Sequence, residues 1–183
     1  MFIHPKAEVL TKAIGEGTRV WQFAVIAEGA VIGKNCNINC HSFIEGKVRI
    51  GNNVTIKSGV FLWNGVVVHD NVFIGPNASF TNDRFPRSKQ HIEPVETVLQ
   101  EGCSIGAHAT IIAGISIGRF AMVGAGSVVT KDVPCYALVY GNPARVMGWV
   151  DEQGRKLIAE TETVFVGEEG IRYEKDATGL CRI

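Results

Sequence analysis

A six-residue repeat runs through most of the chain. Read in steps of six from Val20 to Phe85 and again from Leu99 to Pro134, all seventeen hexads begin with Val, Ile, Leu or Phe. The fifth position is Ala, Cys, Ser, Val or Ile in sixteen of them, and Gly, Asn and Asp are frequent between. Flat strands joined by turns with unusual backbone angles require this combination of large, small and turn-forming residues. The sequence therefore predicts an all-β parallel β-helix of hexapeptide repeats.

The repeat is interrupted once, between Phe80 and Leu99, by the polar segment TNDRFPRSKQHIEPVETV, and we call residues 82–98 the loop. A long segment ejected from a rigid stack usually carries function or reaches a neighbouring subunit. If three hexads form one coil, residues eighteen apart stack, and the loop ends the coil 68–85. One corner column then reads Glu28, Gly46, Asn64, Asn82, Ala113, Lys131. A second corner column reads His41, Gly59, Asn77, His108, Gly126.

Composition limits the classes of partner. The 183 residues include 18 Lys plus Arg and 18 Asp plus Glu, so nothing electrostatic favours nucleic acid or an anionic membrane. The sequence has no run of eighteen apolar residues, and no basic and apolar leader follows Met1. The five cysteines include no CxxC pair for metal or redox chemistry. We expect a cytoplasmic protein whose cysteines are mostly small apolar fillers.

The chain leaves the repeat after Pro134. Residues 135–150 contain the turn Gly141-Asn142-Pro143 and then Arg145, a basic residue suited to phosphate or carboxylate. Residues 151–183 alternate apolar and polar positions between glycines, which predicts a small antiparallel β appendage. The expected division is therefore a β-helix over 1–134, a turn and linker over 135–150, and an appendage over 151–183.

Three segments carry a resemblance to a known family. The array with one loop, the run VGAGSVVTKDVP followed by YGNPARVMG, and the segment IGPNASFTNDRFPRSK resemble the left-handed β-helix acyltransferases. Over about residues 14–150 the chain is similar to N-acetyltransferases that use acetyl-CoA on nucleotide-linked amino sugars of bacterial surface polysaccharides such as lipopolysaccharide. The resemblance is greatest to enzymes acetylating the 3-amino group of dTDP-3-amino-3,6-dideoxyhexoses, and next to those acting on a UDP-linked 2,3-diamino uronic acid.

The resemblance implies a homotrimer with active sites at subunit interfaces and coenzyme A along the upper coils. Asn82 matches the asparagine beside the reacting amine, and the loop beginning at Asp83 would close over the sugar. The positions that match contacts to coenzyme A are Ala113, Ala125, Lys131, Pro143 and Arg145.

Further substrate contacts follow from residue type and place. Trp63, beside Asn64, is an aromatic that could stack on a base or sugar, and Lys57 and Arg87 could meet the diphosphate. The complete set expected to bind the nucleotide sugar is His41, Lys57, Trp63, Asn64, Arg84, Phe85 and Arg87. For His41 and His108, a surface turn is the simpler interpretation unless another subunit's loop meets that corner.

Two departures from the family bear on mechanism. Galactoside and maltose acetyltransferases open this loop with a His-Pro whose histidine is the general base, whereas here the residues are Phe85-Pro86. Some close relatives carry paired cysteines where this chain has Asp151 and Gln153, so we expect no metal.

The chemistry tolerates the missing histidine. An amine on such a sugar should titrate at about 8, so roughly a tenth of it is nucleophilic at pH 7. Asn82 could hold the amine and a backbone N–H near Ala113 could stabilise the oxyanion. Asp83 or His108 could receive the proton, or the proton could leave with the thiolate. The sequence leaves these routes open.

Two other classes of protein use similar arrays. The γ-type carbonic anhydrases need three histidines on zinc, two of them on one coil, and this chain has no two histidines five residues apart. A purely structural solenoid would have repetitive faces and no reason for the loop or the GNPAR turn. Both are therefore minor alternatives to the acetyltransferase.

Overall fold

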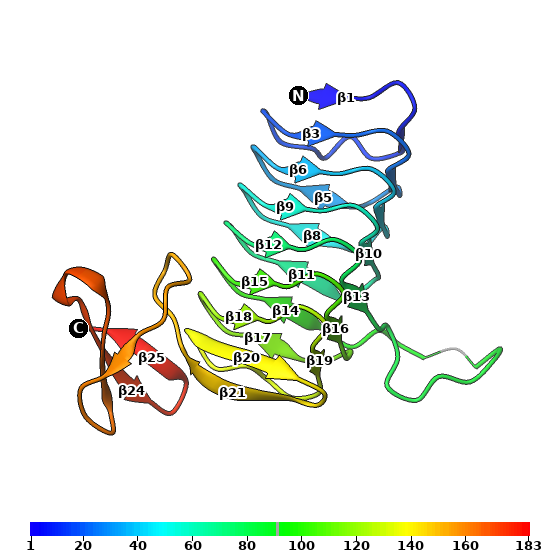
Figure 1. The fold of residues 1–183 in the computed structure, drawn as a ribbon. Helices are drawn as coiled ribbons and strands as arrows, with labels where there is room; N and C mark the ends of the chain where they lie inside the picture. Colours follow the sequence, from blue (N-terminus) through cyan, green and yellow to red (C-terminus); the bar gives the residue numbers. More distant parts are fainter. Residues whose placement is uncertain (91) are drawn as a thin grey trace.

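The computed structural model describes residues 1–90 and 92–183, which form a parallel β-solenoid with a small appended sheet (Figure 1). The predicted fold class is confirmed. His91, a basic residue of the loop, lies outside the described residues.

Three parallel sheets form the sides of the solenoid. The first sheet contains, in order, β1 (Phe2–Ile3), β3 (Arg19–Val20), β6 (Asn37–Ile38), β9 (Thr55–Ile56), β12 (Phe73–Ile74), β15 (Ser104–Ile105), β18 (Met122–Val123), β20 (Ala137–Gly141) and β21 (Ala144–Trp149). The second contains β2 (Glu8–Val9), β4 (Val25–Ile26), β7 (Phe43–Ile44), β10 (Phe61–Leu62), β13 (Ser79–Phe80), β16 (Thr110–Ile111) and β19 (Val128–Val129). The third contains β5 (Val31–Ile32), β8 (Arg49–Ile50), β11 (Val66–Val68), β14 (Thr97–Leu99) and β17 (Ser116–Ile117).

The core is built by the first residues of the hexads. Ile38, Ile56, Ile74 and Ile105 are all fully buried and stand directly above one another in the first sheet. Ladders of identical aliphatic side chains are stable here because each strand is flat and every coil repeats the same backbone. Small buried residues such as Ala24 fill the narrow corners. The hexapeptide pattern thus specifies the interior.

The strand register places the loop. Ile56 pairs with Ile74, eighteen residues later, but Ile74 pairs with Ile105 and Phe80 with Ile111, which are each 31 residues later. The loop therefore leaves the stack between β13 and β14 without disturbing the coils above and below it. This register stacks both predicted corner columns as the sequence indicated.

The residue types in the second predicted corner column follow from a left-handed backbone conformation at that position of the turn. We call the corner that follows the first-sheet strands the first corner. The third turn residue there has positive φ in successive coils, at Phe23, His41, Gly59, Asn77, His108 and Gly126. Gly and Asn adopt this region readily and His does so more often than most residues. The two histidines therefore satisfy a backbone requirement of the turn.

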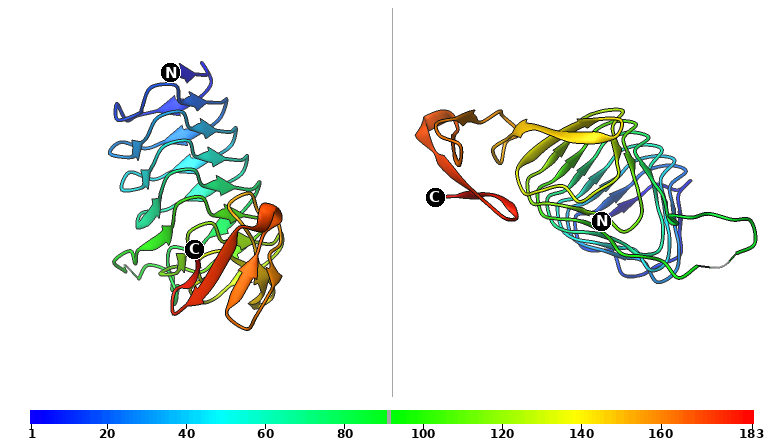
Figure 2. Two further views of the ribbon diagram at one scale, coloured as in Figure 1. Left: turned by 90° about the vertical axis from the view of Figure 1, so that its left-hand side faces the viewer. Right: turned by 90° about the horizontal axis from the view of Figure 1, so that it is seen from below.

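The C-terminal residues form an antiparallel sheet, as predicted for 151–183. Its strands are β22 (Ile158–Ala159), β23 (Val164–Val166), β24 (Arg172–Asp176) and β25 (Gly179–Arg182), with the 3₁₀ turn η1 (Glu168–Gly170) between β23 and β24. It lies on the side of the solenoid opposite the loop in Figures 1 and 2. Residues 135–150, expected as turn and linker, instead provide the β20–β21 hairpin that closes the first sheet.

A partly buried polar contact joins this C-terminal sheet to the solenoid. Glu152 accepts hydrogen bonds from the hydroxyls of Tyr173 (2.5 Å) and Tyr136 (3.2 Å). The backbone of Cys135 pairs with that of Thr178 and Leu180 on the other side. The appended sheet is therefore fixed to the last coil by side-chain and backbone contacts.

Candidate functional site

A cavity of about 330 Å³ lies beneath the loop, at the corner that follows the second-sheet strands, which we call the loop corner. It is lined by Glu45, Asn64, Asn82, Asp83, Pro86, Arg87, Gln90, Ile92 and Pro94. Three successive coils and the loop contribute to it. Four of the residues expected at the site, Asn64, Asn82, Asp83 and Arg87, are brought together here.

Glu45 and Asn64 fix the floor of this cavity. The backbone N–H of Asn64 donates to Oε2 of Glu45 at 2.6 Å, and Oδ1 of Asn64 accepts from the backbone N–H of Lys47 at 2.7 Å. Each side chain thereby satisfies a turn N–H of the adjacent coil. Sequence reasoning missed Glu45, although its position directly before Gly46 of the loop-corner column is a signal that could have found it.

The root of the loop is tied to the coil above. Asp83 accepts from the backbone N–H of Phe85 at 2.7 Å through Oδ1, which makes a tight turn. Arg84 donates to the carbonyl oxygens of Ala113 (2.8 Å) and Gly114 (3.1 Å). Its guanidinium is therefore committed to the next coil and does not line the cavity, where a substrate contact was expected. Phe85 also lies outside the cavity and is 78% exposed.

The N–H groups near Ala113 are already engaged. The N–H of Ala113 donates to Oγ1 of Thr81 at 2.8 Å, and the N–H of Gly114 donates to Oγ1 of Thr97 at 2.9 Å. Thr81 directly precedes the loop and Thr97 is close to its end, so both ends of the loop support this turn. We expected a backbone N–H near Ala113 to stabilise the oxyanion. Within one chain the N–H groups of Ala113 and Gly114 are not free to do so, and for these two groups the expectation is wrong.

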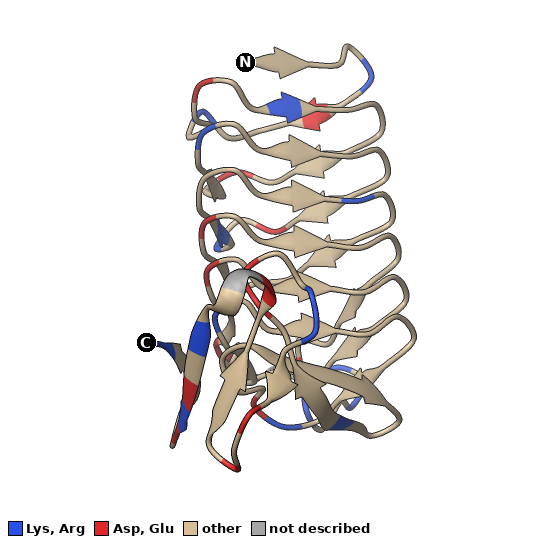
Figure 3. Cartoon of the chain, turned by 60° about the vertical axis from the view of Figure 1, so that its left-hand side comes forward, with Lys and Arg blue, Asp and Glu red and all other residues tan. Residues whose placement is uncertain are grey.

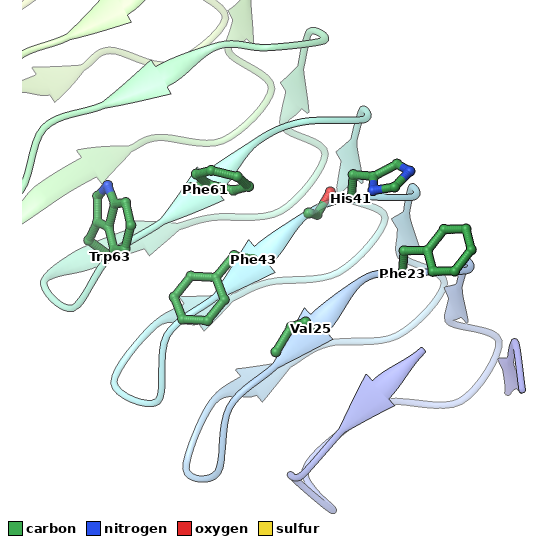
Figure 4. A pocket seen from close by; sticks show the side chains of 7 residues that line it. Phe23, Val25, His41, Phe43, Phe61 and Trp63 are labelled. Carbon is green, nitrogen blue, oxygen red and sulfur yellow. The ribbon is translucent and has the colours of Figure 1, made fainter. Parts of the chain in front are cut away.

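A separate apolar hollow of about 440 Å³ occupies the outer face of the second sheet. It is lined by Phe23, Val25, His41, Ser42, Phe43, Phe61 and Trp63 (Figure 4). The Trp63 ring packs against Phe43 and Phe61, and its Nε1 donates to the carbonyl of Phe80 at 2.8 Å. Trp63 and its neighbour Asn64 thus line different surfaces. His41 stacks on Phe23 with ring centroids 5.1 Å apart.

His108 and Lys57 lie at the first corner, across the second sheet from the cavity. Nε2 of His108 is 3.5 Å from Nδ2 of Asn77. His108 and Ala113 are five positions apart, which is roughly 17 Å of extended chain. Within one chain, His108 is therefore not brought to Asn82 and Asp83.

The expected coenzyme A residues form two groups. Ala113 and Lys131 continue the loop-corner column above Asn82. Lys131 and Arg145 line a shallow cavity of about 220 Å³ with Val129, Asp132, Val133, Val139, Ala144 and Val146. Pro143 lies in the β20–β21 turn, after a cis peptide bond with Asn142. Ala125 lies at the first corner, on the opposite side of the second sheet from Lys131.

Asp151, one of the two positions where the family resemblance raised the question of paired cysteines, forms an ion pair with Arg155. Asp151 is 3% exposed and accepts from Nε of Arg155 at 2.8 Å and from the backbone N–H groups of Gln153 and Arg155. Among the side chains that the structure describes, no three from His, Cys, Asp or Glu gather to hold a metal ion. No described helix is long and apolar enough to span a membrane.

Both basic and acidic residues are seen along the solenoid in the view of Figure 3. The described lining of the cavity beneath the loop holds two carboxylates, Glu45 and Asp83, and one guanidinium, Arg87. The shallow cavity above holds Lys131 and Arg145 against Asp132. The described lining of the cavity beneath the loop thus has a net negative charge, and the lining of the shallow cavity has a net positive charge.

Known proteins share this fold and much of the sequence. The profile of the bacterial transferase hexapeptide family (six repeats) matches residues 11–46, 47–82 and 96–131. The dTDP-3-amino-3,6-dideoxy-α-D-galactopyranose 3-N-acetyltransferase of Aneurinibacillus thermoaerophilus is 58% identical over 157 residues, which are 85% of this chain and 82% of that protein. Serine acetyltransferase 4 of Arabidopsis thaliana is 35% identical over 159 residues, 76% of this chain and 41% of that one.

Two solved structures are similar in fold. A hexapeptide-repeat acetyltransferase of Vibrio cholerae O1 biovar eltor, complexed with acetyl-CoA, is 26% identical with a TM-score of 0.55, covering 75% of this chain and 70% of that one. An N-acyltransferase variant from Bacillus cereus, in complex with dTDP and coenzyme A, is 22% identical with a TM-score of 0.68, covering 76% of this chain and 84% of that one. The second likeness concerns the fold alone.

Proposed function

Because the chain belongs to the bacterial transferase hexapeptide family, we propose that it transfers acetyl from acetyl-CoA to the 3-amino group of a dTDP-linked 3-amino-3,6-dideoxyhexose. The product would serve the synthesis of a surface polysaccharide. The observation that carries the proposal is the difference in charge between the two cavities at the loop corner. The cavity beneath the loop, with two carboxylates and one guanidinium, suits a cationic amine, and the shallow cavity with Lys131 and Arg145 suits the phosphates of coenzyme A.

The reaction forms one amide bond and breaks one thioester bond. The neutral amine attacks the acetyl carbonyl carbon, the C–S bond breaks, and coenzyme A leaves as its thiolate. The amine nitrogen loses one proton in this process. Because the free amine is a competent nucleophile near neutral pH, the enzyme has mainly to orient it and stabilise the developing charge.

We assign the orienting role to Asn82. It lines the cavity beneath the loop and lies one coil below Ala113 in the loop-corner column. Asp83, which lines the same cavity, is the proton acceptor nearest to it along the chain. His108 takes part only if a second subunit brings its first corner to this loop. The oxyanion donor is then a group other than the engaged N–H groups of Ala113 and Gly114.

We further propose a homotrimer whose loop contacts a neighbouring subunit. The apolar hollow on the second sheet supports association, since Phe23 and Phe61 are 49% and 47% exposed in the single chain. In such an assembly Trp63, His41 and Phe85 would meet the partner or its nucleotide. A cytoplasmic location and the absence of a bound metal remain predictions.

The test is thiol release from acetyl-CoA with a panel of nucleotide-linked sugars. The panel contains dTDP-3-amino-3,6-dideoxygalactose, its glucose epimer, and the UDP-linked 2,3-diamino uronic acid of the second candidate. Mass spectrometry should find one added acetyl group on a dTDP-linked amine. Turnover with the uronic acid alone would favour the alternative substrate, and no turnover with any amine would reject the acetyltransferase proposal.

A further inference from the structure

The charge of the cavity beneath the loop points to a specificity residue that the proposed reaction has not yet used. Among its described lining residues only Glu45, Asp83 and Arg87 are charged. Arg84 is turned away onto the coil above. The described lining therefore carries one excess negative charge, which favours a ligand with a positive group.

Glu45 is held in place by the protein but is not neutralised by it. Its Oε2 accepts from the backbone N–H of Asn64, nineteen residues later, and its Oε1 makes no hydrogen bond to any described residue. No ion pair joins Glu45 to a described basic residue. A half-buried carboxylate with one oxygen unpaired is costly unless a ligand completes its partners.

The position of this carboxylate along the stack of coils suits an amine held beside Asn82. Glu45 belongs to the coil two below Asn82, but its carboxylate reaches up to the backbone of Asn64, one coil below. Neighbouring coils are about 4.8 Å apart. A nitrogen between the two levels would therefore lie within hydrogen-bond distance of both groups.

We infer that Glu45 pairs with the 3-amino group of the sugar, as its ammonium form in the resting complex, and thereby selects amino sugars over hydroxy sugars. This inference rests on the proposed function. Glu45 acts here as a specificity residue that binds the substrate nitrogen. The ammonium releases one proton to solvent to become the neutral nucleophile, and Asp83 receives the second proton, which the nitrogen loses on attack. A hydroxyl at the same carbon could donate one hydrogen bond to Glu45 but would bring no positive charge.

The test compares Glu45→Gln with Glu28→Gln. Glutamine at position 45 keeps an acceptor for the Asn64 N–H and removes only the charge. Glu28→Gln removes the same charge from the same corner, outside the cavity. Calorimetry without acetyl-CoA measures the Kd of dTDP-3-amino-3,6-dideoxygalactose and of its 3-hydroxy analogue, dTDP-6-deoxygalactose, at pH 6.5 and pH 9.5.

At pH 6.5, Glu45→Gln should weaken binding of the amino sugar about tenfold or more, because a charge-assisted hydrogen bond is lost. Binding of the hydroxy analogue should change by less than about twofold, and Glu28→Gln should alter neither ligand. The preference of the wild type for the amino sugar should decrease at pH 9.5, where the amine is neutral. A purely structural role of Glu45 would not produce this ligand-specific and pH-dependent difference.

Two results would overturn the inference while leaving the proposed function intact. If Glu45→Gln weakened binding of both sugars equally, Glu45 would only support the backbone of Asn64. If it changed the Kd of neither sugar, Glu45 would not contact the substrate. Failure of the wild type to acetylate any amino sugar would instead reject the proposed function. The two failures are therefore distinguishable.

Discussion

The guanidinium of Arg84 lies against the main chain of Ala113, with Nε 2.8 Å from its carbonyl oxygen. The two residues are 29 positions apart, one at the root of the loop and the other on the next coil. This contact joins the root of the loop to Ala113, one of the residues expected to contact coenzyme A. The position of the loop is thus set by the coil that would hold the thioester.

Removing this contact should loosen the loop. Arg84→Ala deletes two hydrogen bonds from a charged donor, which together contribute about 1–3 kcal/mol. We expect the KM for the amino sugar to rise about tenfold, with a smaller change in the KM for acetyl-CoA. Steady-state kinetics check this, with Lys34→Ala, an exposed corner residue far from the loop, as the control. An unchanged KM for the sugar would show that the loop is fixed by other contacts.

Asn82 should matter more than either histidine. Asn82→Ala is expected to lower kcat by about one to three orders of magnitude, the usual scale for a lost orienting or charge-stabilising hydrogen bond. His108→Ala and His41→Ala should cost less, because both side chains lie at the first corner. Kinetics of the three variants at saturating substrates provide the comparison. A histidine variant that is folded, binds substrate and yet has no turnover would contradict the ranking.

The hollow on the second sheet should be a subunit contact. Phe61→Asp places a charge in this apolar surface. It should reduce the free energy of association by about 2 kcal/mol or more per subunit contact, enough to dissociate a trimer at micromolar concentration. Phe73→Asp is a matched control, since Phe73 is exposed on the outer face of the first sheet. Light scattering should give a trimeric mass for the wild type and Phe73→Asp and a smaller mass for Phe61→Asp. A monomeric wild type would refute the shared site.

Acid should weaken the junction with the C-terminal sheet. Burial raises the pKa of Glu152, but hydrogen bonds from Tyr173, the backbone and Tyr136 outweigh it, so the pKa is lowered overall. Burial also raises the pKa of Asp151, but the hydrogen bonds and charge of Arg155 and the backbone of Gln153 outweigh it, so that this pKa is lowered as well. A lowered folded-state pKa stabilises the protein above the unfolded-state pKa, about 4, and this stability is lost as pH falls through the folded-state value.

We therefore expect the Tm to fall steeply below about pH 4 and Glu152→Gln to reduce that dependence. Thermal unfolding between pH 3 and pH 7 measures it, with the exposed Glu162→Gln as the control. Equal acid sensitivity of wild type and Glu152→Gln would assign the effect to other carboxylates.

Truncation after Val150 should reduce stability more than catalysis. It would uncover Tyr136 and its neighbour Phe120, which pack with Tyr173 and Leu180 of the appended sheet. Because this sheet lies opposite the loop, turnover per folded trimer should largely remain (Figure 2). Activity normalised to the folded fraction checks this. Complete inactivity of a well-folded truncation would mean that the appended sheet serves the site.

The periodic part of this fold could be predicted from the sequence because burial repeats with it. An aliphatic residue every six positions can be buried in only one way when three hexads close a coil, and residues eighteen apart must then stack. The two corner columns, the ejected loop and the placement of Asn64, Asn82 and Asp83 at one corner follow from that repetition. The alternation of residues 151–183 specified a sheet for the same reason.

The directions of the corner and loop side chains depended on the tertiary structure. Trp63 and Asn64 are adjacent in the sequence, yet one packs on the outer sheet and the other lines the cavity. One hydrogen bond from the backbone of Asn64 holds Glu45 in the cavity, and two hydrogen bonds to the backbone of the next coil hold Arg84 away from it. The sequence by itself determined which residues stack, because the hydrophobic effect acts on every repeat. Only the folded chain decided which polar group meets which backbone atom, because those contacts occur once and have no period.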